Sequence, residues 1–130
     1  MLTTIALAAI FHAAPVLTLG AQVVAAEARG ESFAERMRVA CVIANRADDP
    51  TRWRGNAADP WRSVMLAPRQ FAAPYPARPE DAAAFVLGAI LRPCGTATMF
   101  ATPDAVARLG LAERWGTVTY RGAHWYFDPG

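Results

Sequence analysis

The stretch that decides the fold is Ala25–Arg46, AAEARGESFAERMRVACVIANR. It places one acidic residue, Glu27, at the end of an uncharged apolar run. Gly30 then interrupts the helical pattern, and apolar side chains recur from Phe33 onward at the spacing of a second helix. The sequence therefore predicts two helices that meet near Gly30, with Glu27 close to the end of the first.

The second helix carries a signal for its own start. Ser32 and Glu35 have the S-x-x-E spacing of a capping box. In that motif, each side chain accepts a hydrogen bond from a backbone N–H in the other residue's turn. We therefore predict a helix that begins directly after Ser32 and runs to about Arg46.

Glu27 is the candidate catalytic residue of this stretch. Apolar neighbours would remove water from its carboxyl group, and desolvation raises a glutamate pKa from about 4.3 toward neutrality. A carboxylic acid that is still protonated at about pH 6 to 7 can donate a proton to a leaving oxygen. The alternative is a solvated glutamate at a helix end, and spacing alone favours that alternative.

Further along the chain, caps, prolines and apolar runs predict the remaining elements. We expect helices over Val16–Ala28, from the Asp59 cap and Pro60 to about Met65, from Pro79 to Arg92, and from the Thr102 cap to Gly110; a loop over Ala47–Asp59; an extended segment over Thr96–Thr102; and two strands in Thr117–Phe127 around Arg121, Gly122 and Ala123. This pattern is typical of an α+β domain that is mainly helical, with a small C-terminal β-hairpin.

Composition bounds the class of protein. The chain has 130 residues, a formal net charge of +2 and 54% hydrophobic residues. That length suits one domain with a hydrophobic core. The charge is nearly balanced, without the basic stripe of a nucleic-acid-binding protein. We therefore expect a monomer with no nucleic-acid partner.

The two cysteines leave two interpretations open. Cys41 lies on the apolar face of the second predicted helix, where a buried free thiol is common. It could instead form a bridge with Cys94, which lies in a Pro-Cys-Gly loop. Neither cysteine belongs to a metal-ligand spacing, and we expect no metal and no cofactor.

The N-terminal run, residues 1–26, contains no charged side chain and is long enough to cross a membrane. It lacks the positive residues that begin a signal peptide, and Pro15 divides it into two halves. We interpret residues 1–14 as an apolar N-terminal segment, either an added helix or a vestigial export segment, and residues 15–130 as the domain. A membrane contact through residues 1–26 stays open.

Four blocks of the sequence carry a family resemblance. The first is A-E-A-R-G-E with the helix ending V-I-A-N-R, and it is followed by Trp61–Phe71 (WRSVMLAPRQF), Gly95–Pro103 (GTATMFATP) and Thr117–Phe127 (TVTYRGAHWYF). In content and order these blocks resemble the SleB-type cell wall hydrolases, which include the spore cortex-lytic enzymes. One position departs from the family, because Met99 stands where a histidine is usual.

The resemblance implies a lysozyme-like fold and the glycan strand of peptidoglycan as the substrate. It also implies lytic transglycosylation, in which one glutamate, here Glu27, protonates the glycosidic oxygen. The same group then takes a proton from the sugar's 6-hydroxyl, which closes an anhydro ring. The resemblance further implies a place facing the cell wall or periplasm, reached by export or, for a phage endolysin, by release during lysis. Glu31, four residues after Glu27, is interpreted as a brace between helices or as the partner of an arginine.

Residue type and the resemblance together nominate the substrate contacts. Aromatic rings pack on sugar faces, and amides bond acetamido groups. The candidates are Gln70, Phe71, Tyr75, Phe100, His124 and Tyr126. For Gln70 the alternative is an amide that braces its loop, and for His124 it is a strand residue that packs on a neighbour.

Two other functions remain open at this stage. Met99 in place of the usual histidine favours a degenerate, non-catalytic wall-binding or phage structural protein on the same fold. A membrane-tethered protein, anchored by residues 1–26, is the other alternative.

Overall fold

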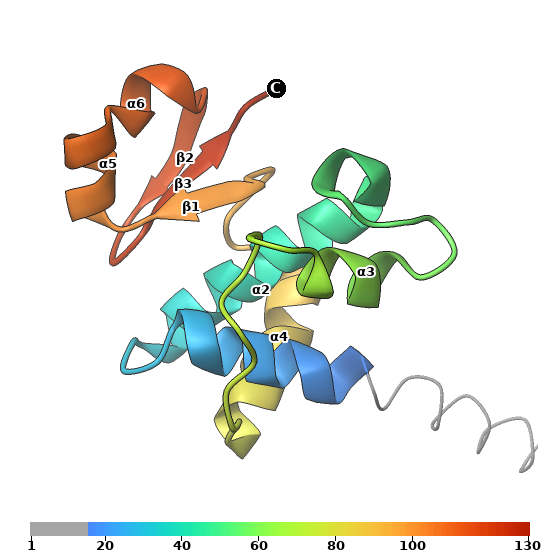
Figure 1. Cartoon of the computed structure of the whole chain (residues 1–130). Coiled ribbons are helices and arrows are strands. Elements are labelled where there is room, and N and C mark those ends of the chain that lie inside the picture. The colour runs from blue at the N-terminus through green and yellow to red at the C-terminus, as the bar shows by residue number, and fades with distance from the viewer. Residues whose placement is uncertain (1–15) are drawn as a thin grey trace, which may run out of the picture.

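The computed structural model describes residues 16–130, so the predicted apolar segment 1–14 lies outside the described residues. An N-terminal helix covers residues 16–27. It is followed by α2 (Phe33–Asp48), the 3-10 helix η1 (Pro50–Trp53), α3 (Pro60–Leu66), α4 (Pro79–Leu91), β1 (Met99–Ala101), α5 (Pro103–Leu109), α6 (Leu111–Arg114), β2 (Thr117–Arg121) and β3 (Trp125–Asp128) (Figure 1). The chain is an α+β protein, as predicted. Within residues 16–130, no helix has the length and apolar character needed to cross a membrane.

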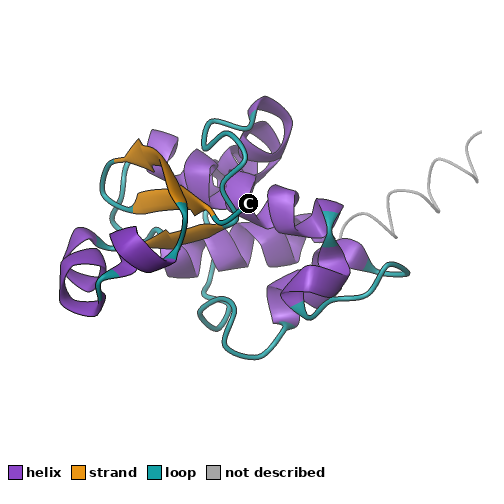
Figure 2. Cartoon of the chain, turned by 90° about the horizontal axis from the view of Figure 1, so that it is seen from above, coloured by secondary structure: helices purple, strands orange, loops and turns teal. Residues whose placement is uncertain are grey.

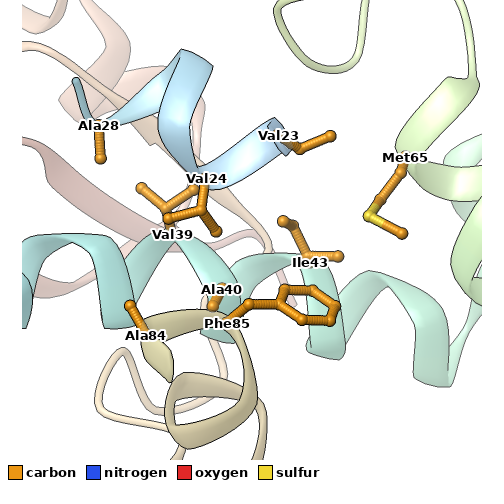
Figure 3. Packing of buried hydrophobic residues seen from close by; sticks show 9 residues of the cluster. All are labelled: Val23, Val24, Ala28, Val39, Ala40, Ile43, Met65, Ala84 and Phe85. Carbon is orange, nitrogen blue, oxygen red and sulfur yellow. The ribbon is translucent and has the colours of Figure 1, made fainter. Parts of the chain in front are cut away.

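The main core lies between the N-terminal helix, α2 and α4. Val24, Val39 and Ile43 are fully buried there, Phe85 of α4 packs beneath them, and Met65 enters from α3 (Figure 3). Burying an aliphatic or aromatic side chain of this size contributes about 1.5–3 kcal/mol. The helical repeat predicted from Phe33 to about Arg46 therefore corresponds to α2, which presents an apolar face to this core.

Close contact between α2 and α4 depends on a glycine. A Cβ added at Gly88 would lie 2.2 Å from the backbone oxygen of Met37. No side chain fits in that space, so Gly88 lets the two helices approach backbone to backbone.

The sheet lies at the other side of α2 and has the strand order β1-β3-β2, with both pairs antiparallel (Figures 1 and 2). The predicted hairpin is confirmed as β2 and β3. The predicted extended segment supplies a third strand, β1, in which Phe100 faces Tyr126 of β3. Helices α5 and α6 cover a second apolar cluster on the sheet, formed by Val106, Leu111 and Phe127.

A disulfide connects the two parts of the fold. Cys41 of α2 is bonded to Cys94, just before β1, with their Cα atoms 5.9 Å apart. Of the two interpretations that the sequence left open, the structure has the bridge. Both cysteines are buried in a cluster that includes Tyr126, so the bridge fixes the start of the sheet against α2.

Three local predictions differ from the structure. The predicted loop after Arg46 begins later, because α2 continues to Asp48, and it contains η1. Helix α6 was not predicted. The Asp59 side chain does not cap α3; it pairs with Arg62 at 3.6 Å instead.

Candidate functional site

Glu27 is the last residue of the N-terminal helix and is half-buried. Its Oε1 atom accepts a hydrogen bond from the backbone N–H of Ala72. Ala72 belongs to the connection between α3 and α4, residues 67–78, and directly follows Gln70 and Phe71. The candidate catalytic carboxylate is therefore held against the loop that carries two of the candidate substrate contacts.

Arg46 lies behind this loop and is buried. Its Nε atom donates to the backbone oxygen of Thr98 at 2.7 Å, and its Nη1 donates to Oε1 of Gln70 at 3.3 Å. Its guanidinium carbon lies 4.6 Å from the ring centroids of Phe71 and Trp53. The Gln70 amide oxygen is thus part of a brace, which was the structural alternative for this residue.

The charge of Arg46 is retained at neutral pH. Burial lowers the pKa of Arg46 to about 10, and the charge of Glu27 opposes that change. A cation that is buried in this way needs nearby anions or acceptors. Arg46 therefore contributes a fixed positive charge close to the Glu27 carboxylate.

An aromatic row extends from this loop to the sheet. The ring of Phe100 lies 6.4 Å from that of Phe71, 5.8 Å from that of Tyr126 and 5.2 Å from that of His124, between centroids. Contacts therefore link Gln70, Phe71, Phe100, His124 and Tyr126 in one series, and Ala72 joins this series to Glu27. Five of the six predicted substrate contacts are brought together, but the prediction is wrong for Tyr126 and His124, because both side chains are buried and bonded to Glu35.

A second carboxylate, that of Glu35, lies at the far end of the row. Its Oε1 accepts hydrogen bonds from the His124 backbone N–H at 3.2 Å, from Nδ1 of His124 at 3.0 Å and from the Tyr126 hydroxyl at 2.5 Å. Its Oε2 accepts from Nη1 of Arg38 at 3.1 Å. Because a carboxylate only accepts, Nδ1 of His124 carries the proton. Only 2% of Glu35 is exposed.

These donors decide the charge of Glu35. Burial alone would raise the pKa of its carboxyl group, but hydrogen bonds from His124, Tyr126 and Arg38 outweigh burial and lower it. The Tyr126 pKa moves upward, because of its own burial and because its hydroxyl donates to Glu35. Glu35 is therefore a fixed anion within the fold.

The predicted capping box is only half formed as a result. The Ser32 hydroxyl accepts from the Glu35 backbone N–H at 3.1 Å, as predicted. The predicted reciprocal bond from the Ser32 backbone N–H to Glu35 is wrong, because the Glu35 carboxylate accepts from His124 and Tyr126 instead. A signal was present in the sequence: Glu35, Val39, Val42 and Arg46 share the buried face of α2. A charged residue on such a face requires a partner elsewhere in the chain.

Tyr75 is the candidate contact that lies apart from the others. The guanidinium carbon of Arg29 lies 4.1 Å from the centroid of the Tyr75 ring. Tyr75 also lines a separate pocket. Met99, the position that departs from the family, also lies apart. Its side chain packs on the cluster under α5 and α6, with Phe127 as its cross-strand partner.

Within residues 16–130, no group of three or more His, Cys, Asp or Glu side chains could hold a metal ion. Comparison of the chain with protein-family models, with curated proteins and with solved structures finds no match.

Proposed function

We propose that this chain cleaves the glycan strand of peptidoglycan as a lytic transglycosylase, with Glu27 as the acid and then the base. The observation that carries the proposal is the Glu27 carboxylate, which is half-buried at a helix end and held by the Ala72 N–H beside the aromatic row. The SleB-type resemblance of the same residues supports the substrate class and the lysozyme-like label.

The reaction needs only this carboxyl group. In its protonated form, Glu27 gives its proton to the glycosidic oxygen as the bond to the anomeric carbon breaks. The resulting carboxylate takes the proton of the 6-hydroxyl, whose oxygen bonds to the anomeric carbon. Both products leave with no water consumed, and Glu27 returns to its starting form.

The surroundings of Glu27 suit these steps. The Ala72 N–H fixes one carboxylate oxygen and leaves lone pairs on the group for a substrate. Glu35 is a poor candidate for a second catalytic carboxylate, because four donors already occupy it.

The disulfide supports an exported protein. Disulfides persist in oxidising compartments, outside the cytosol. The Cys41–Cys94 bridge therefore agrees with the proposed action at the cell wall or in the periplasm.

The test is mass spectrometry of the fragments that the purified protein releases from sacculi. Transglycosylation leaves anhydro ends, and hydrolysis leaves reducing ends that are heavier by one water. Anhydro products that disappear in Glu27→Gln and persist in Glu31→Gln support the proposal. Binding to sacculi without release of fragments would contradict it and favour a non-catalytic wall-binding protein.

A further inference from the structure

A pocket lies on a different face of the N-terminal helix from Glu27. It has a volume of about 310 Å³, and Ala25, Arg29, Arg36, Tyr75, Arg78 and Asp81 contribute to its lining. Ala25 and Glu27 are two residues apart in the helix, which turns the chain by about 200°. The proposed reaction does not use this pocket.

Positive charge is in excess in the pocket. Three guanidinium groups line it, against the single carboxylate of Asp81. Asp81 is 4% exposed, and its Oδ2 accepts from the Arg78 backbone N–H at 2.9 Å at the start of α4. Its other oxygen lies 3.5 Å from Nε of Arg36. Asp81 thus caps a helix and orients Arg36, and it leaves the other two guanidinium groups without a close carboxylate inside the pocket.

The other two arginines are available to a ligand. Within residues 16–130, Arg29 forms no ion pair, and its guanidinium lies flat over Tyr75. Arg78 is 79% exposed in its side chain, and its nearest carboxylate, that of Glu80, is 4.0 Å away. Glu80 also lies 3.9 Å from Arg36, outside the pocket lining. A planar guanidinium held on a ring is well placed to bond a carboxylate with two parallel N–H groups.

The connection between α3 and α4 joins this pocket to the candidate active site. Its Ala72 N–H bonds Glu27, and its Tyr75 N–H donates to the Gln22 backbone oxygen at 3.1 Å. The connection therefore crosses the N-terminal helix and is fixed on it at both points. A substrate that contacts Glu27 and also reaches the arginines must extend around one helix, which is about 10–12 Å across with its side chains.

We propose that this pocket binds a free carboxylate of the peptide stem that peptidoglycan carries on its glycan strand. The inference rests on the proposed function for the identity of the ligand. A stem of five residues spans at most about 17 Å when extended, enough to pass around the helix. The glycan at Glu27 and the stem carboxylate at Arg29 would then be held together on one substrate.

The test is calorimetric titration of the full chain with the free stem pentapeptide, so no glycan cleavage is required. We expect saturable binding that Arg29→Gln weakens about tenfold, the loss of about 1.4 kcal/mol expected for one charged hydrogen-bonded contact. Arg78→Gln is the second variant and should also weaken binding. Arg108→Gln is the matched control, because Arg108 is an exposed arginine on α5 and pairs only with Asp104 among the described residues.

Three results would overturn the assignment: no binding of the pentapeptide, equal binding by wild type and both pocket variants, or tighter binding of inorganic phosphate than of the pentapeptide. A parallel assay on glycan strands stripped of their stems separates this inference from the proposed function. Cleavage of stripped strands without pentapeptide binding would reject the pocket and keep the enzyme. Arginine-dependent pentapeptide binding without cleavage of any glycan would keep the pocket and reject the enzyme.

Discussion

Two carboxylates eight positions apart, those of Glu27 and Glu35, have opposite surroundings. Glu27 is half-buried at a helix end, and within residues 16–130 its carboxylate accepts one hydrogen bond, from the Ala72 backbone N–H. Glu35 is almost fully buried, and four donors reach it, from α2, from β3 and from His124 in the turn before β3. Among the described residues one carboxylate has a single donor, while the other is saturated.

The difference separates a structural acid, Glu35, from the acid that we propose to be catalytic, Glu27. A buried charge is tolerated only when donors compensate it fully, and removing one partner of such a group is costly. Glu35 meets that condition and joins α2 to the sheet. Glu27, which has one backbone donor among residues 16–130, is the acid to which we assign the proposed catalytic role.

Glu27→Gln should have the largest effect in the molecule. We expect release of soluble fragments from sacculi to fall by about 10²–10⁴-fold, near the upper end because one group serves both steps. Thermal stability should stay close to wild type, because the glutamine oxygen can still accept the Ala72 N–H. The activity assay, at matched concentrations of folded protein, measures the loss.

Glu31→Gln is the control for that loss. Glu31 lies beyond the helix end, and a brace there would influence activity only indirectly. Equal activity of Glu27→Gln and Glu31→Gln would contradict a special role for Glu27.

Glu35→Ala should have the largest effect on stability. The substitution leaves His124, Tyr126 and Arg38 without their shared acceptor inside the protein. Breaking a buried charged pair in this way costs about 3–5 kcal/mol. Urea unfolding followed by circular dichroism measures the loss, and a cost under about 1 kcal/mol would show that Glu35 is not the anchor of β3.

The same anchor predicts a pH dependence. The folded pKa of Glu35 lies below its ordinary value, so the stability it contributes is present above that ordinary value. It is lost as the pH falls through the folded pKa. Unfolding curves from about pH 7 to pH 3 should therefore show a steeper loss for wild type than for Glu35→Gln.

Removing the disulfide should have a smaller effect on stability. The bridge closes a loop with a sequence separation of 53 residues, and native bridges contribute about 2–4 kcal/mol. The double substitution of Cys41 and Cys94 by alanine should lower the melting temperature. A variant as stable as wild type would mean that the Glu35 contacts and the Arg46 bond to Thr98 hold the sheet on α2 without the bridge.

Sequence reasoning succeeded where the signal is local. The Ser32 cap, the Thr102 cap and the hairpin around Gly122 depend on residues a few positions apart, and all three form. The position of Glu27 at a helix end is also a local property.

Contacts between distant residues were not accessible in the same way. The bond from Ala72 to Glu27 joins residues 45 positions apart, and the bond between Glu35 and His124 joins residues 89 apart. No periodicity encodes such a pairing. The S-x-x-E spacing even gave Glu35 a local role, which the long-range donors replaced.

Ser32→Ala should have the smallest effect on stability. It tests whether the local cap by Ser32 is independent of the long-range contacts of Glu35. Loss of an N-cap hydroxyl costs about 0.5–2 kcal/mol. Within residues 16–130 the Ser32 hydroxyl is used only by the Glu35 backbone N–H, so the cost should be independent of the Glu35 carboxylate. In a double-mutant cycle with Glu35→Gln, the two losses should add within about 0.5 kcal/mol. A coupling well above that value would mean that the carboxylate also helps to cap α2 in solution, and the contrast between the saturated Glu35 and the proposed catalytic Glu27 would be weaker.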